Sequence, residues 1–337
     1  MKILSVTNMY PTERRPYHGI FVREFVEALE GLGVEVETCF TDTLQGRQAY
    51  FTKLPDLRRV VARRQYDVIH AHHTYSLYQV KLAQFWSQTK APVVFTIHEG
   101  ESTIPKDLRD DKSDWLKKLV YLKKPKKWAL DQADFVVSVN EPIPRALGYQ
   151  GDYDVIPPGV NLEMFQPMDR AECRQRLVIP LEEKVLLFPA DPGNPFKGHR
   201  LLEESLSGLP FPVRVITGGA ILHDEMPLYM NAADAVVQLS EFEASPMVIK
   251  EAMAVNVPMI STDAGDANSI FGPVRGYYIC EKNTRSVADA LGHALEFGSP
   301  TQGRGRILEL GLSLEQVARR YCDIYERAVK STGRAAR

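Results

Sequence analysis

The sequence predicts an α/β protein with two doubly wound domains, each built around a parallel sheet. Short apolar runs alternate with amphipathic stretches along the chain, as strands and covering helices do in such sheets. The chain has 337 residues, which is long for one hydrophobic core but suits two domains. A turn with paired prolines and a glycine, near residues 155–159, separates two similar series of runs. We therefore predict a first domain over residues 1–158 and a second over residues 159–313.

Five apolar runs predict the strands of the first domain. The stretch 21–32 has apolar residues at helical spacing, and Gly33 is suited to end that helix. The predicted strands lie at residues 2–6, 34–39, 67–71, 93–98 and 135–139.

A second series of five runs predicts the sheet of the second domain. Helices are expected at residues 225–232 and 248–254, where apolar side chains recur at helical spacing. The predicted strands lie at residues 185–189, 213–217, 235–239, 259–261 and 277–279.

Composition limits the classes of function. Hydrophobic residues make up 44% of the chain and charged residues 25%, as in ordinary globular proteins. A net charge of −2 does not favour a nucleic-acid binder. The four cysteines are scattered and form no C-x-x-C pair, so we expect reduced core thiols in a cytoplasmic protein. No apolar run approaches the ~20 residues that span a bilayer.

The most informative segment follows the run at residues 235–239. Ser245 is a good N-cap and Pro246 a good first helical residue, because proline lacks an N–H that the first turn would leave unpaired. The segment therefore predicts a strand, a tight turn and a helix, with the N–H groups of Met247 and Val248 unpaired at the helix start. Such N–H groups and the helix dipole favour a bound phosphate.

Two carboxylates flank this turn. Glu243 precedes the helix, and Glu251 lies about 7.5 Å along its axis at 1.5 Å per residue. A nucleotide diphosphate at the helix start would place its ribose near Glu251 and its sugar beside Glu243. The alternative is a capped turn followed by a solvated helix glutamate.

The segment from Glu243 to Glu251 resembles the E-x7-E signature of retaining glycosyltransferases, in particular glycosyltransferase family 4 with its GT-B fold. That fold has two Rossmann-like domains facing a central cleft. The resemblance extends over nearly the whole chain. Within the family, the chain most resembles bacterial glycosyltransferases that build surface polysaccharides. It implies that the first domain receives the acceptor and the second the donor, and that the C-terminal helix, about residues 314–337, crosses back onto the first domain.

A loop rich in glycine, proline and asparagine follows the run at residues 185–189. Its backbone N–H groups can approach a phosphate, and Lys197 can neutralise that phosphate as a point charge. The resembled family usually carries an arginine five residues before this lysine, where this chain has Pro192. Arg200, three residues past Lys197, and Arg23 from the first domain are candidate replacements. The alternative for Lys197 is an exposed lysine at a helix start.

In the first domain, Gly19 precedes a helix and can let backbone approach a ligand closely. His98 ends a predicted strand, where side chains face the ligand edge of a parallel sheet. The resemblance implies that His98 lies beside the transferred sugar. We expect His70 to be structural, and His72 and His73, just past a strand, to be able to reach the cleft.

Six lysines lie between Lys117 and Lys127, with apolar residues among them. Such a stretch could contact an anionic membrane near a lipid-linked acceptor, or bind an anionic glycan. A solvated helix face is the alternative.

Together these features predict a retaining, metal-independent glycosyltransferase that uses a nucleotide-diphosphate sugar, UDP- or GDP-linked, and a glycan or lipid-linked hydroxyl acceptor. No cofactor is expected, and no D-x-D motif is present. A GT-B nucleotide-sugar epimerase and a non-catalytic sugar-nucleotide-binding protein remain as alternatives. The predicted catalytic residues are Glu243, His98 and Lys197, and the predicted donor-binding residues are Glu251, Met247, Val248, Ser245, Gly19 and Arg200.

Overall fold

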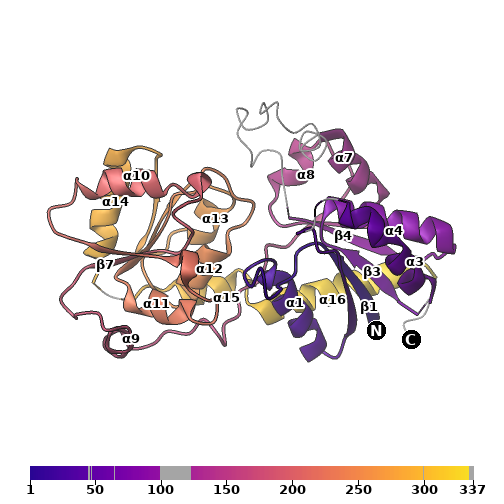
Figure 1. Cartoon of the computed structure of the whole chain (residues 1–337), viewed down its shortest axis with the longest axis horizontal. Coiled ribbons are helices and arrows are strands. Elements are labelled where there is room, and N and C mark those ends of the chain that lie inside the picture. Colours follow the sequence, from indigo (N-terminus) through magenta and orange to yellow (C-terminus); the bar gives the residue numbers. More distant parts are fainter. Residues whose placement is uncertain (45, 47, 64, 99–122, 299, 334–337) are drawn as a thin grey trace. The chain divides into compact units, whose positions relative to one another are not determined.

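The computed structural model describes residues 1–333 except 45, 47, 64, 99–122 and 299. The chain forms two compact units (Figure 1). The first comprises Met1–Pro158 and Leu314–Arg337, and the second comprises Gly159–Ser313.

The first unit contains a parallel six-stranded sheet in the order β2-β1-β3-β4-β5-β6. The central strands β1, β3 and β4 are almost fully buried, because helices cover the sheet (Figure 1), whereas the edge strand β2 is mostly half-buried. The strands are β1 Lys2–Thr7, β2 Glu35–Phe40, β3 Val68–Ala71, β4 Val93–Ile97, β5 Phe135–Ser138 and β6 Asp154–Val155. The described helices are α1 Ile20–Gly31, α2 Ala49–Thr52, α3 Leu54–Ala62, α4 Thr74–Ser87, α7 Lys123–Gln132, α8 Pro142–Ala146 and α16 Leu314–Ser331.

The C-terminal helix α16 completes the core of the first unit. Its apolar face packs with α1 and with the central strands. The buried His70 on β3 hydrogen-bonds the hydroxyl of Tyr325 at 2.7 Å and that of Thr96 at 2.7 Å. Thr96 also shares a 2.9 Å hydrogen bond with Tyr321. These contacts fix α16 against the sheet, and His70 has the structural role predicted for it.

The second unit contains a parallel five-stranded sheet in the order β11-β10-β9-β7-β8. Two clusters of buried apolar side chains form the core of this unit. Together they contain residues from the strands and from all of its larger helices. The strands are β7 Val185–Phe188, β8 Arg214–Thr217, β9 Ala235–Gln238, β10 Met259–Thr262 and β11 Tyr277–Cys280. The helices are α9 Arg170–Leu177, α10 His199–Leu206, α11 Met226–Ala232, α12 Met247–Ala254, α13 Ala267–Phe271, α14 Thr284–Leu295 and α15 Gly303–Glu309.

The predicted fold class is confirmed: both units are Rossmann-like, with parallel sheets and covering helices. Each of the ten predicted strands is present, and no end differs from its prediction by more than one residue. The two-residue strand β6 was not predicted, because Asp154 and Val155 are too few to form a recognisable apolar run.

Candidate functional site

Residues 239–246, called here the acidic turn, join β9 to α12 at the carboxyl end of the sheet of the second unit. Glu243 lies in this turn with 19% of its side chain exposed. Glu251 lies on α12 and is 7% exposed. Neither carboxylate faces bulk solvent, so the reading of Glu251 as a solvated helix glutamate is wrong. Parallel sheets bind ligands at this edge.

The turn is joined to the loop that follows β7. Lys197 Nζ lies 2.6 Å from Glu243 Oε1. The loop also accepts a backbone hydrogen bond, 2.8 Å long, from the N–H of Glu241 to the carbonyl of Phe196. Asn194 accepts from the N–H of Phe196 at 3.1 Å and so begins the short 3₁₀ turn Pro195–Lys197. The structure thus brings together two residues predicted to be catalytic.

Gly198 makes this contact possible. It adopts a left-handed conformation with φ of 77°, and a Cβ there would lie 2.3 Å from the carbonyl oxygen of Leu239. Leu239 directly follows β9, so the loop carrying Lys197 packs against the start of the acidic turn. Only glycine allows this approach without displacement of backbone.

The predicted capping role of Ser245 is wrong. Helix α12 begins at Met247, and Pro246 occupies the N-cap position with extended backbone, φ −68° and ψ 127°. The Ser245 hydroxyl instead donates to Asp266 Oδ2 at 2.5 Å and accepts from Lys250 Nζ at 2.7 Å. Its hydroxyl is therefore committed to buried charged groups. Met247 and Val248 do form the first turn of α12, as predicted.

Lys250 and Asp266 were not singled out in the sequence. Lys250 has no exposed surface, and burial lowers the pKa of its ammonium group, whereas the nearby carboxylates of Asp266, Glu251 and Glu243 oppose that shift. Asp266 is 9% exposed and occupies the N-cap position of α13. The available signal was a lysine next to Glu251 in a helix whose other residues are all apolar.

The loop after β10 supports the turn from its other side. Gly265 has φ of 69°, and a Cβ there would lie 2.8 Å from the carbonyl oxygen of Ala244. Thr262 Oγ1 donates to the carbonyl of Ser240 at 2.8 Å. The acidic turn is thus held between the loops that follow β7 and β10.

Arg200 does not complete a cationic clamp with Lys197. Its guanidinium pairs with Glu204 at 2.8 Å, one turn along α10, and its side chain is 90% exposed. The i,i+4 spacing explains this pairing. The role of Arg200 as a replacement for the arginine absent at Pro192 therefore stays a prediction.

In the first unit, His98 directly follows β4. Its ring lies 5.1 Å from that of Phe21 and 5.7 Å from that of His72. His72 is 2% exposed, and neither ring nitrogen has a hydrogen-bond partner. Burial, reinforced by neighbouring histidines, lowers the pKa of His72 and that of His70. His72 is a core residue, so the expectation that it reaches a cleft is wrong.

Gly19 precedes α1 with φ of 72°. A Cβ at this position would lie 2.3 Å from the carbonyl carbon of Met9. The chain's own backbone therefore already requires glycine here. Contact between Gly19 and a donor stays a prediction.

The lysine-rich stretch lies only partly within the described residues, because Lys117, Lys118 and the remainder of 117–122 fall outside them. Lys126 is 1% exposed, and Lys127 pairs with Asp131 at 2.7 Å. Lys126 therefore does not belong to a solvated basic face. In the part of the chain that the structure describes, no group of three histidine, cysteine or acidic residues could hold a metal ion. No helix there is long and apolar enough to cross a membrane.

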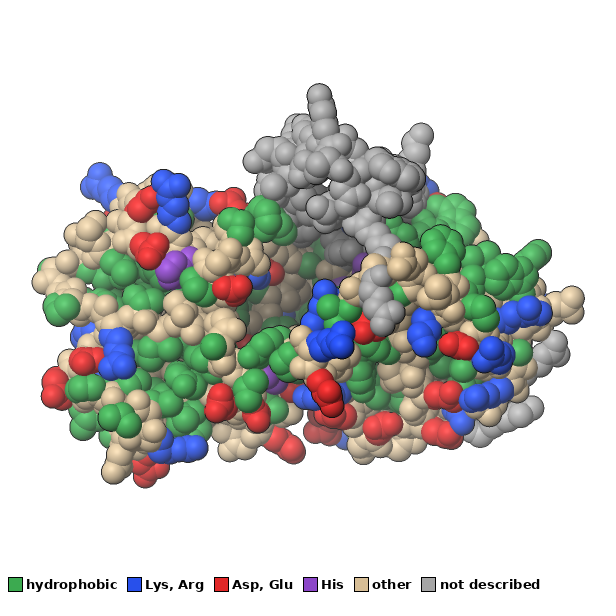
Figure 2. Space-filling view, in the orientation of Figure 1, with side chains coloured by type: hydrophobic (Ala, Val, Ile, Leu, Met, Phe, Trp, Pro, Cys, Tyr) green, Lys and Arg blue, Asp and Glu red, His purple; other side chains and the backbone are tan. Residues whose placement is uncertain are grey.

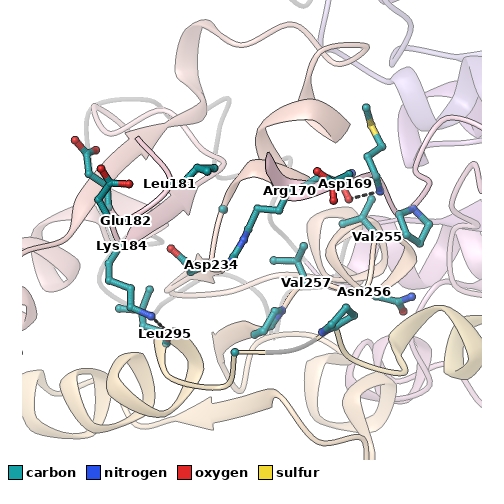
Figure 3. A pocket seen from close by; sticks show the side chains of 18 residues that line it. Asp169, Arg170, Leu181, Glu182, Lys184, Asp234, Val255, Asn256, Val257 and Leu295 are labelled. Atoms are coloured by element: carbon teal, nitrogen blue, oxygen red, sulfur yellow. Dashed lines mark hydrogen bonds and ion pairs between the residues drawn. The ribbon is translucent and has the colours of Figure 1, made fainter. Parts of the chain in front are cut away.

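A cavity of about 430 Å³ lies at the opposite, amino-terminal edge of the second sheet (Figure 3). Asp234 on its wall pairs with Arg170 at 2.6 Å and with the buried Arg174 at 2.8 Å. Lys184 donates to the carbonyl of Leu295 at 2.8 Å. These charged groups are satisfied within the protein, so the cavity is a weaker candidate than the acidic turn.

Two glycosyltransferase families match different parts of the sequence. Glycosyltransferase Family 4 matches residues 18–164, and Glycosyl transferases group 1 matches residues 193–296. The chain is also 25% identical, over 86% of its length and 88% of the relative's, to a Bacillus subtilis protein assigned to teichuronic acid biosynthesis as the glycosyltransferase TuaC.

Solved structures share the fold. Sucrose-phosphate synthase from Thermosynechococcus elongatus gives a TM-score of 0.78 at 19% identity, covering 98% of this chain and 99% of that one. Anabaena HepE, in a complex with UDP and glucose, gives a TM-score of 0.72 at 17% identity, covering 97% and 100%. With both units matched in sequence and in fold, the chain belongs to the GT-B glycosyltransferases of the family 4 and group 1 type.

Proposed function

We propose that this glycosyltransferase moves a sugar from a nucleotide-diphosphate donor to a hydroxyl acceptor with retention at the anomeric carbon. The observation that carries the proposal is the ion pair between Lys197 and Glu243 at the turn into α12. The reaction must stabilise a departing diphosphate and a sugar that develops positive charge. A cation and a carboxylate held side by side suit these two needs.

Each residue of the candidate site has a proposed task. Lys197 and the N–H groups of Met247 and Val248 bind the diphosphate, since a positive charge and a helix N-terminus both favour anions. Glu243 orients the donor sugar and supports its developing charge. Glu251 accepts hydrogen bonds from the ribose and so sets the register of the donor. Because these groups can neutralise the diphosphate, we propose that the reaction needs no metal ion.

The donor is proposed to be a UDP-sugar, with a GDP-sugar as the second choice. HepE, which shares the fold, holds UDP and glucose in its complex. The relative assigned to teichuronic acid biosynthesis favours a surface polysaccharide as the product. The acceptor is accordingly proposed to be a growing glycan or a lipid-linked sugar at the cytoplasmic face of a membrane.

An exposed apolar face of the first unit supports the proposal that the protein contacts a membrane. Leu82, Phe85 and Trp86 on α4 are 44%, 78% and 46% exposed. Trp128 on α7 is 44% exposed and stacks on Tyr78 of α4 at 5.0 Å. Hydrophobic side chains gather in Figure 2 over the region where Figure 1 places α4 and α7. Such aromatic side chains suit the interface between water and lipid.

The test begins with a screen for released nucleoside diphosphate, using UDP-glucose, GDP-mannose and ADP-glucose with and without acceptor glycans. Glu243→Ala should lower turnover on the best of these donors by at least 10²-fold while the protein stays folded. Glu204→Ala, on the exposed face of α10, is the matched control and should keep wild-type turnover.

Two outcomes favour the alternatives. Interconversion of donor epimers without acceptor would identify an epimerase. Nucleotide-sugar binding with no turnover on any donor or acceptor would identify a non-catalytic binding protein. Retention is tested separately, by NMR of the anomeric proton in the first product formed.

A further inference from the structure

The ammonium group of Lys250 is enclosed in the second unit, directly behind the acidic turn. The residue has no exposed surface, although it lies on a helix that begins at the proposed donor site. Burying an ammonium is costly, and an apolar side chain of similar volume is often tolerated as well or better. The charge at this position therefore calls for a reason other than stability.

The contacts of Lys250 all lead to the turn. Its Nζ donates to Ser245 Oγ at 2.7 Å and lies 3.4 Å from the carbonyl oxygen of Pro246. Ser245 in turn donates to Asp266 at 2.5 Å. One ammonium thus connects the last two residues before α12 with the loop that follows β10.

The charges around Lys250 come from three different segments. Asp266 is the N-cap of α13, Glu251 follows Lys250 on α12, and Glu243 lies in the turn. Asp266 also has a buried Oδ1 without a hydrogen-bond partner. The ammonium is therefore the positive centre of a group of carboxylates that includes both acids of the turn.

We propose that Lys250 is a positioning residue of the transfer reaction, which acts through Ser245 and Pro246 to hold Glu243 in its catalytic geometry. This inference rests on the proposed role of Glu243. Lys250 touches neither donor nor acceptor, because no part of it is accessible. Asp266 shares this role by fixing the Ser245 hydroxyl from the opposite side.

The position of Glu243 depends on both ends of the turn. Lys197 holds its carboxylate, and the network of Lys250, Ser245 and Asp266 holds the backbone two residues further along. Displacement of a reacting group by about 1 Å can cost 10²-fold in rate. Loss of the network should therefore lower kcat more than it raises the donor KM.

The test compares variants on each side of the contact. Lys250→Met removes the ammonium, Ser245→Ala removes its acceptor, and Ser245→Thr keeps a hydroxyl in place. Lys184→Met is the matched control, because Lys184 also makes a hydrogen bond within the second unit but lies at the far edge of the sheet. Turnover is measured on the fastest of UDP-glucose, GDP-mannose and ADP-glucose, per folded protein judged by circular dichroism.

We expect Lys250→Met and Ser245→Ala each to lower kcat about 10- to 100-fold, with the donor KM changed less than about threefold. Ser245→Thr should recover most of the loss. The double variant should lose no more than the worse single variant, because both changes remove one contact. Hydrogen exchange at residues 242–248 should be faster in Ser245→Ala, which supports the proposal even if Lys250→Met does not fold.

Three results would overturn the inference. They are wild-type kcat in Ser245→Ala, equal losses in Ser245→Ala and Ser245→Thr, and multiplied losses in the double variant. Glu243→Ala separates the two proposals. If Glu243→Ala is inactive while Ser245→Ala is normal, only the role of Lys250 fails. If Glu243→Ala itself is normal, the proposed function of the turn fails.

Discussion

Lys197 Nζ lies 2.6 Å from Glu243 Oε1, so a loop after β7 and a turn after β9 share one ion pair. The two strands are neighbours in the sheet, and parallel neighbours end at the same edge. The side chains are 35% and 19% exposed, so solvent screens the pair incompletely. A diphosphate arriving at this edge would meet a cation that is already held in place.

Replacing Lys197 should therefore impair turnover more than folding. We expect Lys197→Met to lower kcat about 10²- to 10³-fold, the range found when one preorganised donor to a developing charge is removed. Lys197→Arg keeps the charge and should retain more activity. Steady-state kinetics on the active donor provide the measurement. Equal losses in both variants would mean that the charge of Lys197 is not what matters.

Glu251 should act in binding rather than in chemistry. Glu251 is 7% exposed on α12, and its carboxylate could accept two charge-assisted hydrogen bonds from a ribose. We expect Glu251→Gln to weaken UDP binding about 10- to 100-fold, since each tenfold corresponds to about 1.4 kcal/mol. Isothermal titration calorimetry with UDP measures this. Glu309→Gln, whose side chain is 72% exposed on α15, is the control and should bind UDP normally.

Substitution of Gly198 tests how closely the loop after β7 must approach the acidic turn. Its φ of 77° and its distance from Leu239 leave no room for a Cβ, so Gly198→Ala should destabilise the second unit by about 2–4 kcal/mol. Gly305→Ala is the matched control, because nothing lies within 4 Å of a Cβ there. That helical change should be neutral or stabilising by up to about 1 kcal/mol. Urea unfolding, followed by fluorescence, compares them; equal stabilities would contradict the proposed crowding.

The strand, turn and helix around Glu243 could be predicted from local sequence, because burial of β9 and of one face of α12 requires apolar residues at regular spacing. The pairing of Lys197 with Glu243 could not be deduced in the same way. The partners are 46 residues apart, and their contact depends on β7 and β9 being adjacent in the sheet. Strand order is a property of the whole fold.

Burial of polar residues was the second source of error. Lysine is almost never fully buried unless paired, so its residue type does not predict the full burial of Lys250 in α12. Ser245 was assigned to the helix cap by its type, although the buried charges of Lys250 and Asp266 bind its hydroxyl. His72 follows a strand, as ligand-edge residues do, yet the neighbouring rings cover it.

The apolar face of the first unit should bind lipid. We expect a Phe85→Ser, Trp86→Ser double variant to partition at least tenfold less onto vesicles of phosphatidylethanolamine with 30% phosphatidylglycerol. The reason is the loss of two exposed aromatic side chains from α4. Phe51→Ser is the control, because Phe51 is an aromatic residue of similar exposure, 76%, on a different helix, α2. Vesicle sedimentation measures binding, and unchanged partition of the double variant would remove the case for this surface.

The buried histidines should make the first unit sensitive to acid. Burial lowers the pKa of His70 and that of His72 below the usual 6.5, so between these folded values and about pH 6.5 the unfolded chain binds more protons. Stability is therefore fully present above about pH 6.5 and falls as the pH drops below it. Each histidine contributes up to about 1.4 kcal/mol per pH unit in that range.

His72→Phe should flatten this dependence, because the ring is buried and neither nitrogen has a hydrogen-bond partner to lose. The difference in Tm between pH 7.5 and pH 5.5 should be smaller in this variant than in the wild type. His293→Gln changes an exposed histidine on α14 and should leave the difference as it is. A Tm that falls equally with acid in all three proteins would show that carboxylates, rather than His72, dominate the acid response.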